Sequence, residues 1–240
     1  MTARLYVTAL SNPSKAVSGM LAHKRLPHRR IDLLAGFHPY LVRAAGFSGR
    51  TVPALELADG RQVQGSLEIS RALDELIPER PLFPDDPVER GAVERAERWG
   101  HDELQPIPRR IFRWGVQEDP VVRTWLAGEV EGVPVPAIVA TLTRPISTLR
   151  CAEAGGTEDT IRDNVRRLPG LLDLADALFG EGTLGGPEPN AADFQILSSV
   201  RMLLDLKALP SAEHRPSARA ARELFPRFGG EIPLFEVPGT

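Results

Sequence analysis

The sequence predicts an N-terminal α/β domain joined to an all-helical C-terminal domain. Residues 1–77 alternate between short apolar runs typical of strands and amphipathic segments typical of helices. Residues 78–87 contain four prolines, which is typical of a linker. From residue 88 onward, apolar residues recur mainly at helical spacing. We therefore expect domains at 1–77 and 88–240, with a linker at 78–87.

The first three elements are expected to form a β-α-β unit. Residues 5–10 predict a buried strand, and Asn12 and Pro13 then fit the N-cap and first turn of a helix. Pro27 ends this helix, and residues 30–33 predict a second strand. A connection of this length implies a right-handed crossover and a parallel pair of strands.

A hairpin and a helix complete the first domain. Residues 36–50 show no regular pattern. Residues 54–57 and 62–64 predict two strands joined at Asp59-Gly60, a dipeptide favoured in hairpin turns. The segment 66–76 then carries apolar residues on one helical face.

Four segments of the second half predict helices, the last of them shorter than the others. They lie at 88–103, 160–179, 191–206 and 217–224. We expect the second of them to break near Pro169-Gly170, because proline lacks the N–H that a helix interior needs.

The composition argues against several classes of protein. A net charge of −3 gives no bias toward nucleic acid or an anionic membrane. The single cysteine, Cys151, excludes an intramolecular disulfide framework, and the five histidines show no metal-ligand spacing. No stretch has the length of a membrane span, and the first residues lack a signal-peptide core. We expect a cytoplasmic protein without a metal ion or a permanently bound cofactor.

The segment from Thr51 to Ser66 predicts a binding site. An X-Pro bond adopts cis readily, and a cis bend at Val52-Pro53 leaves the N–H and C=O of Val52 free to pair with an extended peptide. Ser66 opens a helix whose N-terminal amides favour an anion. These parts together suit a small anionic peptide beside the edge of a sheet.

This combination resembles the cytosolic glutathione transferase family, in its serine-type branch. The resemblance covers nearly the whole chain, and it implies a thioredoxin-like domain followed by a helical bundle. The segments that carry it are the turn at 11–14, Thr51-Val52-Pro53-Ala54-Leu55, Gly65-Ser66, Leu184-Gly185-Gly186 and Asn190-Ala191-Ala192-Asp193-Phe194. In the family the last segment is a helix capping box, for which Asn190 and Asp193 have the right type and spacing.

The resemblance implies a glutathione site on the first domain. Val52, followed by Pro53, would pair its backbone with the cysteinyl unit, and Ser66 would bind the γ-glutamyl carboxylate. Gly65 stands where the family usually has an acidic or glutamine side chain that contacts the γ-glutamyl amino group. Gln64 would compensate only from the other face of the sheet, because neighbouring strand residues point in opposite directions.

Two further residues are candidates for the remaining carboxylate of glutathione. The resemblance implies a cation for the glycyl group, and Arg50 and His38 are available in this part of the chain.

Catalysis in such a site requires a thiolate, because a thiol with a pKa of roughly 8.5 is mostly protonated at neutral pH. A hydroxyl that donates to the sulfur beside a helix N-terminus favours the charged form. Ser11 matches the serine-type position, with Ser14 as the backup; both are also ordinary capping residues. Tyr6 should face the opposite side of the sheet. The absence of a cysteine near this turn argues against a cysteine-dependent reductase.

The second substrate would lie under the helical half. Arg109, Arg110, Arg113 and Trp114 are candidates for its pocket, although a basic, solvated helix surface is the other interpretation. The proline-interrupted segment 120–156 indicates broken helices that form either this acceptor pocket or a dimer contact.

The expected activity is conjugation of glutathione, or another small thiol, to a hydrophobic electrophile, as in detoxification. Two alternatives remain open: a non-catalytic binding or scaffold protein with this fold, and a thiol-dependent isomerase. The resemblance also implies a homodimer. The identity of the electrophile does not follow from the sequence.

Overall fold

The computed structural model describes residues 2–129, 135–206, 212–227, 229 and 232–240. Its first half is built on a four-stranded mixed sheet in the order β2-β1-β3-β4. The strands are β1 (Ala3–Val7), β2 (His28–Asp32), β3 (Ala54–Glu56) and β4 (Gln62–Gln64). β1 is parallel to β2 and antiparallel to β3, which in turn is antiparallel to β4.

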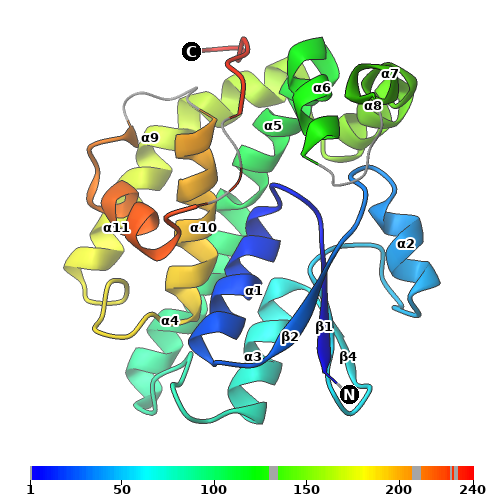
Figure 1. Cartoon of the computed structure of the whole chain (residues 1–240). Helices are drawn as coiled ribbons and strands as arrows, with labels where there is room; N and C mark the ends of the chain where they lie inside the picture. Colours follow the sequence, from blue (N-terminus) through cyan, green and yellow to red (C-terminus); the bar gives the residue numbers. More distant parts are fainter. Residues whose placement is uncertain (1, 130–134, 207–211, 228, 230–231) are drawn as a thin grey trace.

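Helices cover both faces of this sheet (Figure 1). Helices α1 (Asn12–His23) and α3 (Ser66–Leu76) pack on one face and separate the sheet from the helical half. Helix α2 (His38–Ala44) lies on the other face. The alternation of β1 explains the two sides, since Leu5 and Val7 join the main core while Tyr6 packs edge-on against Phe47.

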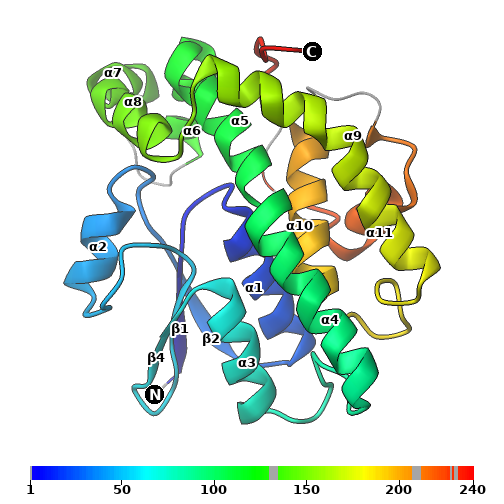
Figure 2. The ribbon, with the colours of Figure 1, turned by 180° about the vertical axis from the view of Figure 1, so that it is seen from behind.

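The second half is mostly helical. Its elements are α4 (Pro87–Trp99), a π-helical turn η1 (Gly100–Leu104), α5 (Pro106–Glu118), α6 (Pro120–Gly128), α7 (Pro136–Leu142), α8 (Arg144–Glu153), α9 (Glu158–Gly180), α10 (Ala191–Asp205) and α11 (Pro216–Leu224). Figure 2 shows α4 and α5 running beside α10, with α9 on the outer side. Within the described ranges, every helix is too short or too polar to cross a lipid bilayer.

Buried hydrogen bonds join the two halves. Asn12 in the first turn of α1 donates from Nδ2 to the Ser199 hydroxyl, 3.0 Å away, and to the Gln105 carbonyl, 3.2 Å away. Ser70 on α3 donates to a carboxylate oxygen of Glu97 over 2.7 Å, and Arg71 donates to the other oxygen. Since unpaired buried polar groups are costly, these contacts fix α1 and α3 against the helical half.

Three expectations for the first half need correction. The first strand ends at Val7 rather than at residue 10, because Leu10 adopts a positive φ of 57° in the turn that follows. Ser11, and not Asn12, is the N-cap of the next helix. Residues 36–50 were expected to be irregular, yet they contain α2; Pro39 stands in its first turn, where a missing N–H costs nothing.

Two helices of the second half also differ from expectation. Pro169 lies inside a continuous α9, between the buried residues Leu168 and Leu172 that hold the helix on the core. The helix expected over 88–103 changes to a π-helical turn at Gly100. A Cβ at this glycine would approach the Ile196 side chain to 2.6 Å, so the two chains pack too closely for a larger residue.

Candidate functional site

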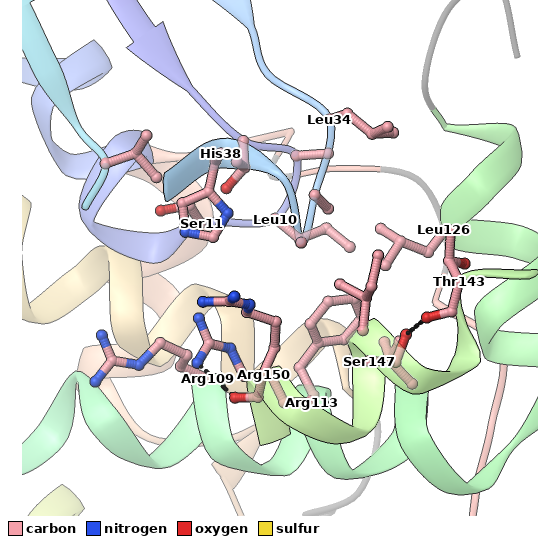
Figure 3. A pocket seen from close by; sticks show the side chains of 18 of the residues that line it. Leu10, Ser11, Leu34, His38, Arg109, Arg113, Leu126, Thr143, Ser147 and Arg150 are labelled. Atoms are coloured by element: carbon pink, nitrogen blue, oxygen red, sulfur yellow. Dashed lines mark hydrogen bonds between the residues drawn. The ribbon is translucent and has the colours of Figure 1, made fainter. Parts of the chain in front are cut away.

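A cavity of about 170 Å³ lies where the end of the sheet meets the helical half. Figure 3 shows Ser11, Leu10 and His38 on the sheet side and arginines on the helical side. The sheet side comprises the β1–α1 turn at 8–13, the loop before α2, and Thr51 with Val52. The helical side comprises residues of α5, α6, α7 and α8, together with Met202 of α10.

The hydroxyl of Ser11 is held at the N-terminus of α1. Ser11 has extended backbone angles, and its Oγ accepts from the Ser14 amide at 3.3 Å and from the Ser14 hydroxyl at 2.9 Å. A serine oxygen accepts two hydrogen bonds and donates one. Both acceptor positions of Ser11 are therefore filled, and its proton is available to a group in the cavity. Ser14 is 3% exposed and does not line the cavity.

The backbone of Val52 is presented to the same cavity. The Val52-Pro53 peptide bond is cis, and in the described part of the chain neither the N–H nor the C=O of Val52 is hydrogen-bonded. Gln64 holds the loop before it: the side-chain oxygen accepts from Gly49 N at 2.9 Å, and Nε2 donates to Thr51 O over 2.7 Å. The side-chain amide of Gln64 is thus hydrogen-bonded to the loop, and it does not take the place of the side chain that Gly65 lacks.

The N-terminus of α3 lies outside the residues that line the cavity, as does Pro53. Ser66 is 1% exposed, and its Oγ is buried without a hydrogen-bond partner. Gly65 is the N-cap with a φ of 98°, a conformation that favours glycine. The carboxylate of Glu68 occupies the place that a side chain at position 65 would take.

Of the two cation candidates, only His38 lines the cavity. It is the first residue of α2, and its Nδ1 is buried without a hydrogen-bond partner. Burial lowers the pKa of His38 to about 4, and the positive charges of Arg113 and Arg150 act in the same direction. The imidazole is therefore neutral at pH 7. Arg50 is exposed and does not line the cavity.

Four arginines line the helical side. Arg109 and Arg113 come from α5, Arg123 from α6 and Arg150 from α8. Two of the residues proposed from the sequence do not line it. Arg110 donates from Nε to Ala154 O over 2.8 Å, and Trp114 packs against the main core.

Arg123 and Arg150 were missed by sequence reasoning. Both belong to the segment 120–156, whose sequence predicts either an acceptor pocket or a dimer contact. Helices α6, α7 and α8 contribute to the cavity, while residues 130–134 of this segment lie outside the described residues. The one signal in the sequence that could have indicated them is the presence of an arginine among the apolar residues of each short helix.

The capping box at the start of α10 is present. Asn190 accepts from the amides of Ala192 and Asp193, and the Asp193 carboxylate accepts from Asn190 N at 3.0 Å and from Gly185 N at 2.9 Å. Burial raises the pKa of Asp193, which these backbone hydrogen bonds oppose. Neither side chain lines the cavity.

Comparisons with known proteins show which proteins share this fold. Residues 11–76 match the family model of the glutathione S-transferase N-terminal domain. No curated protein matches the chain.

Solved structures of glutathione S-transferases resemble nearly the whole chain. One, from Rhodospirillum rubrum F11, is 20% identical with a TM-score of 0.60 and covers 99% of this chain and 98% of its own. Another, from Methylobacterium radiotolerans JCM 2831 in complex with glutathione sulfonate, is 19% identical with a TM-score of 0.58 and covers 99% and 97%. Beta-etherase LigF from Sphingobium sp. strain SYK-6 is 18% identical with a TM-score of 0.61 and covers 93% and 99%.

Residues 11–76 are therefore similar to a glutathione S-transferase N-terminal domain, and they have a thioredoxin-like fold. The chain as a whole has the glutathione S-transferase fold.

Proposed function

We propose that the protein is a glutathione S-transferase-like enzyme that binds glutathione, or a closely related γ-glutamyl thiol, and joins its sulfur to an electrophile. In this proposal residues 1–77 hold the thiol peptide and residues 88–240 hold the electrophile. One observation carries it. The Ser11 hydroxyl, with a proton left to donate, and the unpaired backbone of Val52 line the same cavity.

The peptide would bind along the free backbone edge. The N–H and C=O of Val52 would pair with the cysteinyl unit, as a neighbouring strand would. The buried, unpartnered Oγ of Ser66 and the first amides of α3 would bind the γ-glutamyl carboxylate. The glutathione sulfonate in the Methylobacterium relative supports a ligand of this class.

Ser11 would lower the pKa of the bound thiol. Its O–H would donate to the sulfur, and the two hydrogen bonds that its oxygen accepts polarise this O–H. The N-terminus of α1 adds a favourable potential. The thiol proton passes to solvent, the thiolate forms a carbon–sulfur bond with the electrophile, and the electron pair leaves with the departing group.

One observation favours a second candidate, a binding protein without turnover. The Glu68 carboxylate lies over Gly65 at the N-terminus of α3, beside the place where the γ-glutamyl carboxylate would bind. Two like charges at one helix end repel each other and weaken binding. This alternative predicts weak binding of the thiol peptide and no conjugate formed by either the wild-type chain or Ser11→Ala.

The test combines binding and turnover. Isothermal titration with glutathione is expected to show binding by the wild-type chain, and chlorodinitrobenzene is expected to be conjugated. Ser11→Ala should retain binding and lose most of the turnover. Ser18→Ala is the matched control, because Ser18 lies on α1, donates to Ser14 O and does not line the cavity. No binding at millimolar glutathione would contradict the proposal.

We also propose a homodimer, in which the α/β half of one subunit faces the helical half of the other. Light scattering of the purified chain tests this, and a monomeric mass would contradict it.

A further inference from the structure

We propose that the helical side of the cavity binds the anionic group of a second ligand, a carboxylate or sulfonate attached to an apolar, ring-sized body. The assignment of this ligand as the acceptor of the sulfur rests on the function proposed above. Its binding does not, because the arginines that define the site belong to the helical half.

Three guanidinium groups gather on one wall of the cavity. Arg109 and Arg113 are one turn apart on α5 and therefore share a face, and Arg150 comes from α8, which packs against α5. Figure 3 shows the three side chains together, across the cavity from Ser11 and His38. The wall is thus formed by two helices that are brought together only in the folded chain.

The charge of this wall is not balanced inside the cavity. No aspartate or glutamate is among the described residues that line it. Arg150 pairs with Glu153, a half-exposed residue outside the lining. Burial lowers the pKa of Arg109 to about 10, with the positive charges of Arg113 and Arg110 acting in the same direction.

Several donor atoms of the wall are left without an acceptor. The Nε atoms of Arg109 and Arg150 are buried and have no hydrogen-bond partner, and no other hydrogen bond of the Arg109 side chain occurs within the described residues. One N–H group of Arg113 donates to Arg150 O, 3.0 Å away. Unpaired buried cations are costly, and an anion that accepts from them would remove this cost. The wall therefore fits an anionic group better than a neutral one.

The rest of the cavity indicates the chemistry of the uncharged part of the ligand. Many of the remaining lining residues are apolar, and they include Leu10, Leu34, Phe112, Leu126 and Ile146. The two hydroxyls at this end are already used, since Thr143 donates to Val139 O and Ser147 donates to Thr143 O. A ligand would therefore place its charge at the arginines and an apolar ring against these side chains.

The competing interpretation is that the arginines hold a carboxylate of the thiol peptide. The experiment separates the two with a matched pair of probes, 2-naphthoate and its neutral analogue 2-naphthamide. Binding of each probe to the full chain is followed by fluorescence, first without any thiol and then with saturating glutathione. We expect 2-naphthoate to bind about tenfold more tightly than 2-naphthamide, since a hydrogen bond to a charged group contributes about this much.

Four variants locate the effect. Arg109→Gln and Arg150→Gln should each reduce the preference for 2-naphthoate to about twofold or less, with the affinity for glutathione unchanged. Arg110→Gln on α5 and Arg144→Gln on α8 are the matched controls. Neither residue lines the cavity, and both controls should retain the preference. Thermal unfolding of each variant shows whether it is folded.

The outcomes are distinguishable. Equal binding of the two probes by the wild type, or a preference that survives in Arg109→Gln and Arg150→Gln, would overturn the proposal. So would a parallel loss of glutathione affinity in these variants, together with competition between glutathione and 2-naphthoate, because the arginines would then hold the peptide. Failure of conjugation alone affects the proposed function and leaves the binding result intact.

Discussion

The Ser14 hydroxyl donates to the Ser11 hydroxyl over 2.9 Å, and the Ser14 amide donates to the same oxygen at 3.3 Å. This pair ties a helix cap to a hydroxyl that faces the cavity. Because Ser11 caps through its oxygen, it can donate its proton to a ligand without giving up the cap. The structural and chemical roles of Ser11 are therefore separable by mutation.

Two substitutions at Ser11 separate these roles. Ser11→Ala removes both the cap and the donor, so we expect a loss of about 1 kcal/mol in the free energy of unfolding and a fall in kcat/KM of about 100-fold. Ser11→Asp keeps an oxygen that can cap but, when ionised, donates no hydrogen. It should unfold like the wild type and lack turnover. Urea denaturation and steady-state kinetics measure the two effects, and an active Ser11→Asp enzyme would refute the role of the proton.

Gln64 is expected to control glutathione binding through the loop that precedes Val52. Gln64→Glu removes the donor to Thr51 O and leaves the carbonyl beside a carboxylate. We expect KM for glutathione to rise about 3- to 10-fold, which corresponds to one hydrogen bond, with little change in kcat. Gln62→Glu is the control, because Gln62 is exposed and its Nε2 donates to Ala45 O, away from the cavity. Equal kinetics of the two variants would contradict this role.

The capping box should contribute to stability and not to ligand binding. Asn190→Ala removes the acceptor for two amides at the start of α10, and we expect the free energy of unfolding to fall by about 1 to 2 kcal/mol. The affinity for glutathione should not change, because Asn190 does not line the cavity. Urea denaturation and isothermal titration of the same preparation test both statements. An Asn190→Ala variant with unchanged stability and weaker glutathione binding would contradict both statements.

His38 should make stability depend on pH below neutrality. The pKa of His38 is lowered to about 4 in the folded chain, against about 6.5 in an unfolded one. The unfolded state therefore binds more protons between these values. The contribution of the neutral His38 ring to the free energy of unfolding is therefore complete above pH 6.5, and it is lost as pH falls toward 4.

The measurement for His38 is direct. The imidazole resonances of His38 should stay those of a neutral ring down to about pH 5, which follows from the lowered pKa, and His38→Gln should flatten the dependence of unfolding on pH in this range. A His38 titration midpoint near 6.5 would show that the ring is not held as described.

Much of the first domain could be predicted because its signals are local. The Asp59-Gly60 turn, the alternating strands and the helix that Gly65 opens are all encoded within a few residues, and α3 occupies residues 66–76 as expected. Helix α2 was missed because its seven residues are too few to show a helical period. Pro169 predicts a helix break by a local rule, and this prediction is wrong because the rule does not include the packing that holds α9 on the core.

The arrangement of the site depended on contacts that no local pattern contains. Ser11 and Val52 lie in one cavity, as a strand-edge site requires, and His38 faces it as well. Arg150 and His38 are about a hundred residues apart in the sequence. Arg150 reaches the same cavity only because α8 packs against α5. A solvated surface was the alternative for the basic residues of α5. In the structure Arg109 and Arg113 line the cavity, whereas Arg110 does not.

The central claim is that Ser11 stabilises the thiolate of a bound peptide. Ultraviolet difference spectroscopy of the glutathione complex measures the pKa of the bound thiol directly, because the thiolate absorbs where the thiol does not. We expect a thiol pKa well below the free value of roughly 8.5 in the wild type, and a return toward that value in Ser11→Ala. The same thiol pKa in both complexes would contradict the account.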